Sequence, residues 1–183
     1  MNGSIEVICG SMFSGKSEEL IRRIKRVKYA KQSYIVFKIN IDDRYHKDNV
    51  VTHDGIQVNA IPVRNIDDMK KYLYDNKVDV IGIDEVTFFE NGIVEFIDDL
   101  ANNGYRVVVS GLDQDFLGRP FPIIANLLAI ADKIDKLHAV CLECGGVACK
   151  SHRLSNNKDI IQIGSSGMYE PLCTKCYINK TKE

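Results

Sequence analysis

A stretch of eight residues near the N-terminus, 10–17, constrains this chain more than any other feature. It reads G-x-x-x-x-G-K-S and lies between an apolar run, residues 5–8, and a segment with helical periodicity, residues 18–30. A strand, a glycine-rich turn and a helix in this order form a P-loop, whose backbone N–H groups and helix dipole surround phosphate oxygens. The whole stretch is therefore predicted to bind a nucleoside triphosphate: Gly10, Ser11, Met12, Phe13, Ser14, Gly15, Lys16 and Ser17.

The side chains of this motif also predict a metal ion. Lys16 is expected to reach the β- and γ-phosphates, and the Ser17 hydroxyl to ligate Mg²⁺. A third predicted strand, residues 78–83, runs directly into Asp84 and Glu85. An acid after an apolar strand of a P-loop protein is typical of a Walker B motif, so Asp84 is expected to hold Mg²⁺ directly or through water. Glu85, one residue on, is a candidate general base. An isolated Asp-Glu pair would more simply be a surface turn.

The remaining apolar segments predict the fold class. Strands are expected at 34–38, at 56–61 with Pro62 ending the strand, at 106–111 and at 136–140. Helices are expected at 66–76, where Asn65 is the candidate cap, at 92–102 and at 123–131, while 40–54 and 112–122 are expected to be loops. Strands that alternate with helices indicate an α/β protein of the P-loop (RecA-like) type, with a mainly parallel sheet and helices on both faces.

Length and charge limit the classes of partner. The chain has 183 residues, enough for one domain or for one domain and a small module. Its net charge is −1, so no global field favours nucleic acid or membrane binding. The N-terminus lacks a basic stretch followed by an apolar segment, and a cytoplasmic protein is expected. Five cations follow the P-loop in the predicted helix and are interpreted as a solvated face or a subunit contact rather than a nucleic-acid surface: Arg22, Arg23, Lys25, Arg26 and Lys28.

Four cysteines near the C-terminus form two C-x-x-C pairs, Cys141 with Cys144 and Cys173 with Cys176. Two such pairs predict a structural tetrahedral zinc site, and two free redox pairs are the alternative. The 28 residues between the pairs are expected to form a long excursion that acts as a lid. We therefore expect a P-loop domain over about 1–140 and a small zinc-binding domain over about 141–183. Cys9 is interpreted as a core residue.

Together these motifs resemble the type II thymidine kinases, the family of the cellular cytosolic and poxviral enzymes. The matching stretches are 10–17, 19–23, 42–45, 52–54, 81–89, 111–121, the two cysteine pairs and Tyr169. They cover nearly the whole chain, in the order and with the spacing of the family. The resemblance implies transfer of the γ-phosphoryl group of ATP to the 5′-hydroxyl of thymidine or deoxyuridine, which gives dTMP for DNA synthesis. It also implies a homotetramer and feedback inhibition by dTTP.

The resemblance assigns further roles by position. It implies that Glu85 accepts the proton of the 5′-hydroxyl. It places Asp42, Asp43 and Arg44 near the sugar and the phosphates, and Val86 and Thr87 beside the acidic pair. The implied nucleoside site consists of Met12, Leu112, Phe116, Phe121 and Tyr169, together with a lid segment called the lasso, here Ile160, Ile161, Gln162, Ile163 and Gly164.

Some positions depart from the family pattern. Val86 and Thr87 stand where the family usually has Gly or Ala and then Gln, and Ser165 replaces a glycine of the lid. Three alternatives stay open at this point. They are a RecA-like ATPase or nucleic-acid-binding module with a zinc ribbon, a kinase of another deoxynucleoside, and a regulatory relative with weak catalysis.

Overall fold

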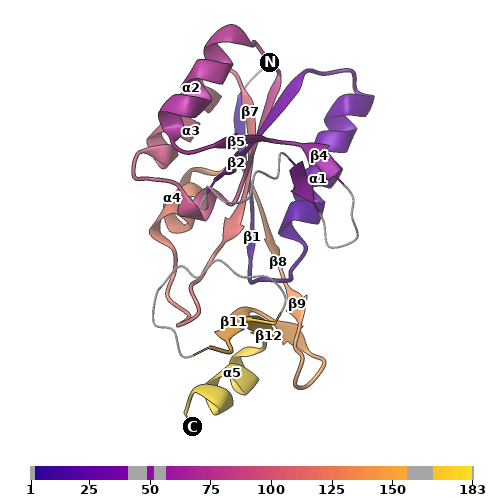
Figure 1. Ribbon diagram of the computed structural model, residues 1–183, viewed down its shortest axis with the longest axis vertical. Coiled ribbons are helices and arrows are strands. Elements are labelled where there is room, and N and C mark those ends of the chain that lie inside the picture. Colours follow the sequence, from indigo (N-terminus) through magenta and orange to yellow (C-terminus); the bar gives the residue numbers. More distant parts are fainter. Residues whose placement is uncertain (1–2, 41–48, 52–56, 156–166, 183) are drawn as a thin grey trace.

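A computed structural model describes residues 3–40, 49–51, 57–155 and 167–182 of the chain. At its centre six strands form one sheet in the order β5-β2-β6-β7-β1-β8, and every pair of neighbours is parallel (Figure 1). The strands are β1 (Ser4–Gly10), β2 (Tyr34–Ile39), β5 (Ile61–Val63), β6 (Val80–Asp84), β7 (Arg106–Leu112) and β8 (Lys133–Leu137). One strand, β7, thus separates the strand before the P-loop from the strand that ends in Asp84.

Helices cover both faces of this sheet. On one face lies α1 (Lys16–Tyr29), while α2 (Ile66–Asp75), α3 (Ile93–Asn102) and α4 (Pro122–Ile130) lie together on the other (Figure 1). The side chains of α1 that pack on the sheet recur every three or four residues: Leu20, Ile21, Ile24 and Val27. Asn65 caps α2 as predicted, because its side chain accepts a hydrogen bond from the Asp68 N–H at 2.9 Å. The predicted fold class is confirmed.

The segment after β2 differs from the prediction in two respects. Within the expected loop at 40–54, Asn49–Val51 forms a strand, β3, that pairs antiparallel with β4 (Gln57–Asn59). The expected strand at 56–61 is in fact divided between β4 and β5, and Pro62 lies inside β5 instead of ending it. Because β5 is the edge strand of the large sheet, Pro62 can lack an N–H without losing a hydrogen bond to a second neighbour.

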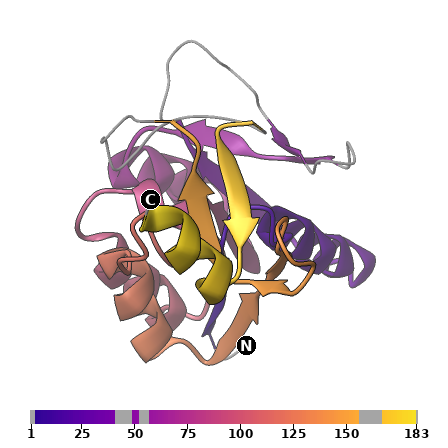
Figure 2. The same ribbon diagram turned by 90° about the horizontal axis from the view of Figure 1, so that it is seen from below.

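The prediction of one last strand at 136–140 is also wrong, because this segment belongs to two strands. The structure has β8 three residues earlier, and a separate strand β9 (Ala139–Val140) after a break at His138. After β9 come β10 (Val147–Ala148), β11 (Lys150–Arg153), β12 (Tyr169–Leu172) and a helix that the sequence did not predict, α5 (Thr174–Thr181). These C-terminal elements lie beside the P-loop end of the sheet (Figures 1 and 2).

One member of the basic stripe on α1 is not on a solvated face. The Arg23 side chain is only 3% exposed, and its guanidinium donates to the carboxylates of Glu6 on β1, Glu19 on α1 and Asp135 on β8. Arg22, Lys25, Arg26 and Lys28 are exposed as expected. Arg23 therefore fixes the helix that follows the P-loop to two strands of the sheet.

Candidate active site

The P-loop is shaped by two glycines. Gly10 and Gly15 have φ angles of 150° and 82°, which favour glycine, and a Cβ on Gly10 would lie 2.3 Å from the Leu137 carbonyl oxygen. Within the loop, the Ser11 carbonyl accepts hydrogen bonds from Lys16 Nζ at 2.7 Å and from Ser14 Oγ at 2.8 Å. Burial lowers the pKa of Lys16, although the carboxylates of Glu85 and Asp84 act in the opposite direction. The loop thus holds its lysine across a turn whose backbone can enclose an anion.

Asp84 lies beside the P-loop. It is the last residue of β6 and is only 3% exposed. Its carboxylate faces Ser17 at the start of α1, with 3.3 Å between Ser17 Oγ and Asp84 Oδ2. An octahedral Mg²⁺ with ligands at about 2.1 Å holds neighbouring oxygens about 3 Å apart, so these two groups fit one ion. On its other side the carboxylate accepts a hydrogen bond from Ser110 Oγ on β7.

Glu85 follows directly and has a left-handed backbone, with φ 57° and ψ 35°. Burial raises the pKa of Glu85 to about 7, and the adjacent charge of Asp84 adds to this effect, while Lys16 and Lys38 oppose it. A carboxylate with a pKa near the working pH is suited to accept a proton. The next two residues turn away from solvent: Val86 is fully buried in the core, and Thr87 Oγ1 donates to the Leu112 carbonyl at 3.1 Å.

The residues predicted for the nucleoside site belong to two regions that contact one another. Met12 lies in the P-loop, and its N–H donates to Ser151 Oγ on β11 at 3.0 Å. Leu112 ends β7, while Phe116 and Phe121 follow in the next loop, where the Phe121 ring meets Phe88 edge-on with 6.1 Å between centroids.

Phe116 connects that loop to the C-terminal elements. Its ring lies under the Arg153 guanidinium at 3.8 Å, and its carbonyl accepts a hydrogen bond from the Tyr177 hydroxyl at 2.7 Å. Arg153 also donates to the hydroxyl of Tyr169, at 3.0 Å from Nε and 2.6 Å from Nη2. The predicted residue Tyr169 is thereby linked to Phe116 through one guanidinium. Phe13, from the P-loop, packs against the cluster around the cysteines.

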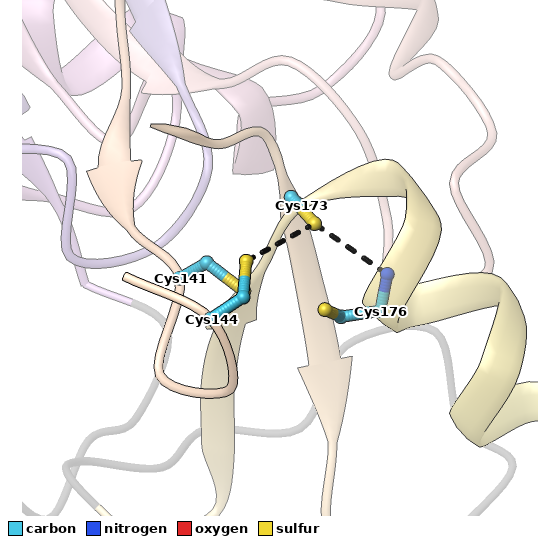
Figure 3. A group of neighbouring side chains, drawn as sticks. All are labelled: Cys141, Cys144, Cys173 and Cys176. Carbon is cyan, nitrogen blue, oxygen red and sulfur yellow. Dashed lines mark hydrogen bonds between the residues drawn. The ribbon is translucent and has the colours of Figure 1, made fainter. Parts of the chain in front are cut away.

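The four cysteines come together as predicted (Figure 3). Their sulfur atoms all lie within 4.8 Å of one another, and Cys144 Sγ is 3.8 Å from Cys173 Sγ. Four thiolates at about 2.3 Å from a zinc ion in tetrahedral geometry are about 3.8 Å apart, so the cluster fits zinc. Burial raises the pKa of Cys141, but backbone N–H groups of both pairs outweigh it and bring the value down to about 6. Hydrogen bonds from the neighbouring cysteines lower the pKa of Cys173 too and raise that of Cys176 to about 12, so the four close sulfur atoms need a cation before all of them can be thiolates.

Several predicted residues lie outside the described part of the chain: Asp42, Asp43, Arg44, Ile160, Ile161, Gln162, Ile163 and Gly164. Conversely, the structure adds residues that the sequence analysis missed, namely Ser110, Ser151 and Tyr177. The sequence did carry a signal for Ser110. It is a serine near the carboxyl end of an otherwise apolar strand, and because packing there needs no hydroxyl, a polar role could have been expected. Ser151 stands in a Ser-x-Arg stretch that also occurs in the family, whereas Tyr177 had no signal, since its partner is a main-chain group of a distant segment.

The sheet, the loop between β1 and α1 and the acid at the end of β6 define a P-loop α/β protein with a cysteine cluster that fits zinc. A family model described as thymidine kinase matches residues 3–177. Two curated relatives, thymidine kinases of Bacteroides thetaiotaomicron and Bacteroides fragilis, are each 47% identical over 181 residues, which is 99% of this chain and 90% of theirs. The chain therefore belongs to the thymidine kinase family. This confirms the family and the kinase class that its motifs predicted.

The chain also matches a solved structure. It is described as a DNA replication initiation factor and matches 74% of this chain and 40% of its own, with a TM-score of 0.41 and 12% identity. A likeness this weak carries no argument about fold or function. Among the described residues, no helix combines the length and the apolar character needed to cross a membrane.

Proposed function

We propose that the protein transfers the γ-phosphoryl group of ATP to the 5′-hydroxyl of thymidine or deoxyuridine and so supplies dTMP for DNA synthesis. The observation that carries this proposal is the meeting of Lys16, Ser17, Asp84 and Glu85 at one edge of the sheet, in a chain of the thymidine kinase family. Phosphoryl transfer needs positioning and charge neutralisation more than covalent chemistry, and these groups supply both.

The P-loop and the acidic pair would act on the ATP side. Residues 10–17 would enclose the phosphates, with Lys16 at the β- and γ-phosphates. Ser17 and Asp84 would hold Mg²⁺, which neutralises charge on the transferred group when it is bound. Glu85 would accept the proton of the 5′-hydroxyl, which its raised pKa supports. We assign Asp42, Asp43 and Arg44 to the same side by their match to the family alone. We assign Val86 and Thr87 to it by their position after the acidic pair, although both differ from the family pattern.

The nucleoside would bind between the P-loop and the C-terminal elements. The contacts of Met12 with Ser151 and of Phe116 with Arg153 and Tyr177 support this location, because each joins a predicted pocket residue to that region. An aliphatic and aromatic slot from Met12, Leu112, Phe116 and Phe121 suits a flat pyrimidine. We assign Tyr169 and residues 160–164 to the lid over it.

We assign zinc a structural role, because four thiolates leave no open position for a substrate. In this proposal residues 1–140 form the catalytic domain, and the metal clamps the two ends of the excursion within residues 141–183. We further propose a cytoplasmic homotetramer that is inhibited by dTTP and that has no nucleic-acid or membrane partner. The tetramer and its inhibition rest on the family resemblance, and the absence of nucleic-acid and membrane partners rests on the net charge of −1.

One assay separates this proposal from its rivals. Purified protein with ATP and Mg²⁺ is offered thymidine, deoxyuridine, deoxycytidine, deoxyguanosine or single-stranded DNA, and both ADP and nucleoside monophosphate are followed. We expect dTMP in equal amounts with ADP. Monophosphate from another deoxynucleoside only would assign a different kinase. ADP that appears only with DNA would instead favour an ATPase that uses the exposed cations of α1.

A further inference from the structure

We propose that Ser110 is a positioning residue that holds the Asp84 carboxylate in the orientation that binds Mg²⁺. Ser110 lies on β7 and is fully buried, so it acts through Asp84 and not on the nucleotide itself. The inference rests on the proposed function, because it assumes that Asp84 and Ser17 share a divalent cation.

Two serines hydrogen-bond to the Asp84 carboxylate, and only one of them, Ser17, is within reach of both oxygens. Ser110 Oγ donates to Oδ1, while Ser17 Oγ is 3.3 Å from Oδ2 and 3.5 Å from Oδ1. Ser110 is in the sheet and Ser17 is at the start of α1. Ser110 therefore holds Oδ1 from the side of the sheet, and Oδ2, the oxygen slightly nearer to Ser17, is the one we expect to ligate the cation.

Strand register explains why Ser110 reaches this place. In the parallel pair of β6 and β7, Ile83 lies opposite Val109, so Asp84 and Ser110 come one residue later on both strands. Side chains alternate between the faces of a sheet, and Gly82, two residues before Asp84, faces Ile24 of α1. Val108, two residues before Ser110, packs in the same cluster as Ile24. Both polar side chains thus point to the face that carries α1 and Ser17.

The terminal torsion of an aspartate is soft, and a carboxylate without a fixed donor can rotate or turn its charge elsewhere. A hydroxyl from a buried strand removes that freedom. Groups that orient a metal ligand in this way commonly change metal affinity by about 10- to 100-fold when they are removed. Ser110 should therefore affect the affinity for the metal far more than the affinity for the nucleoside.

The test measures binding of Mn²⁺, a paramagnetic substitute for Mg²⁺, to the complex of the protein with ADP, by electron paramagnetic resonance. In Ser110→Ala we expect the Kd for Mn²⁺ to rise about 10-fold or more, while the Kd for ADP without metal changes less than 2-fold. In the kinase assay the apparent KM for Mg²⁺ should rise in parallel, and the KM for thymidine should stay the same. A matched control is Ser33→Ala, which removes a hydrogen bond of 2.7 Å to Asp79 just before the start of β6, away from the P-loop.

A second variant separates the hydrogen bond from packing. Ser110→Cys fills the same site with a weak donor and should lose Mn²⁺ affinity as Ser110→Ala does. If Ser110→Ala bound Mn²⁺ with wild-type affinity, the hydroxyl would have no positioning role. The same would follow if Ser110→Cys kept wild-type affinity while Ser110→Ala lost it. Neither result would affect the proposed function. An equal loss in Ser33→Ala would overturn it as well. Wild-type protein that binds ADP but no Mn²⁺ would overturn both the inference and the metal site of the proposed function.

Discussion

At the scale of single residues, Glu85 combines an unusual backbone with an unusual acidity. A left-handed conformation outside glycine costs on the order of 1 kcal/mol, and such residues gather at functional sites. This turn directs the chain from β6 into the buried residues Val86 and Thr87. Glu85 therefore stays at the carboxyl end of the strand, next to Asp84 and close enough to Lys16 to affect its pKa.

Glu85→Gln should retain ATP binding and lose phosphoryl transfer, because an amide cannot accept the proton of the 5′-hydroxyl. We expect kcat to fall by about 10²- to 10⁴-fold. Steady-state assays with thymidine, together with a measured Kd for ADP, check this expectation. Turnover at the wild-type rate would show that another group accepts the proton.

The pH profile should report the same carboxylate. A base works in its ionised form, so kcat of the wild type should fall as the pH decreases through the pKa of Glu85, which is about 7 in the metal-free protein. A bound divalent cation stabilises the ionised form and should move this limb to lower pH. The limb should be absent from the residual activity of Glu85→Gln. If Glu85→Gln showed the same decrease of kcat at low pH, that decrease would belong to another titrating group.

Arg23 is the residue on which we expect stability to depend most. Arg23→Ala would leave the carboxylates of Glu6, Glu19 and Asp135 without their shared cation. Each carboxylate keeps a second cation, Arg106, Arg22 or Lys133, so we expect a loss of about 1.5–3 kcal/mol of unfolding free energy, the contribution of a hydrogen bond to a charged group. Urea unfolding at pH 7 measures this, and Arg26→Ala, on the exposed face of the same helix, should change stability by less than about 0.5 kcal/mol.

The same cluster should make stability depend on acid. The Arg22 and Arg23 guanidinium groups lower the pKa of Glu19 to about 2 against the opposing effect of burial, and Arg106 and Arg23 lower that of Glu6 in spite of burial. A carboxylate whose pKa is lowered by folding stabilises the fold at pH values above its pKa in the unfolded chain, about 4.3. This stabilisation is lost as the pH falls toward its pKa in the folded protein. The difference between wild type and Arg23→Ala should therefore shrink between about pH 4 and pH 2. A constant difference would contradict this linkage.

At the scale of elements, the four-cysteine cluster joins the segment after β9 to the start of α5, which follows β12. Cys173 accepts the first hydrogen bond of α5, and the next turn carries Tyr177, which reaches Phe116. Cys173→Ser should lower the zinc content and raise the KM for thymidine before it affects ATP binding. Cys149→Ser is the control, since its sulfur lies outside the cluster and contacts Thr174 at 3.3 Å. Metal analysis that finds no zinc in the wild type would refute the structural role.

Tyr177→Phe tests the contact between α5 and the loop after β7 more gently. It removes only the hydroxyl that donates to the Phe116 carbonyl at 2.7 Å. We expect the KM for thymidine to rise several-fold with little change in kcat, because a neutral hydrogen bond contributes about 1 kcal/mol. Tyr29→Phe, at a residue that is 84% exposed, should leave both constants unchanged. A change confined to kcat would mean that the contact serves catalysis and not nucleoside binding.

Most of the elements could be predicted because local pattern and packing agree. The apolar runs of β1, β6 and β7 are long, and each leads into a motif or a loop that the sequence makes recognisable. The rest depends on neighbours in space. Pro62 is compatible with a strand only because β5 has one neighbour in the sheet, and Arg23 is buried only because Glu6 and Asp135 lie beneath α1. The Ser110 hydroxyl reaches Asp84 because of the register between β7 and β6, which the sequence does not specify.

At the scale of the whole molecule, the two ends of the sheet order differ in what they offer to another chain. At one end β5 contains Pro62, which removes a donor from that edge. At the other end β8 is the last strand in the order, and between its charged residues it carries an apolar side chain, Ile134, which is 48% exposed. An open strand of this kind is a template for pairing with a second copy. The proposed tetramer would cover it.

Sedimentation of the wild type should therefore give a particle of four times the chain mass of 20.6 kDa. Ile134→Lys replaces the exposed apolar side chain of β8 with a charge and should reduce the particle to a smaller assembly, because an unpaired lysine is costly to bury between two chains. Ile178→Lys, at a residue of similar exposure on α5, is the matched control and should leave the mass unchanged. A monomeric wild type would contradict the tetramer, and an intact assembly in Ile134→Lys would mean that the chains meet through another surface, such as the exposed cations of α1.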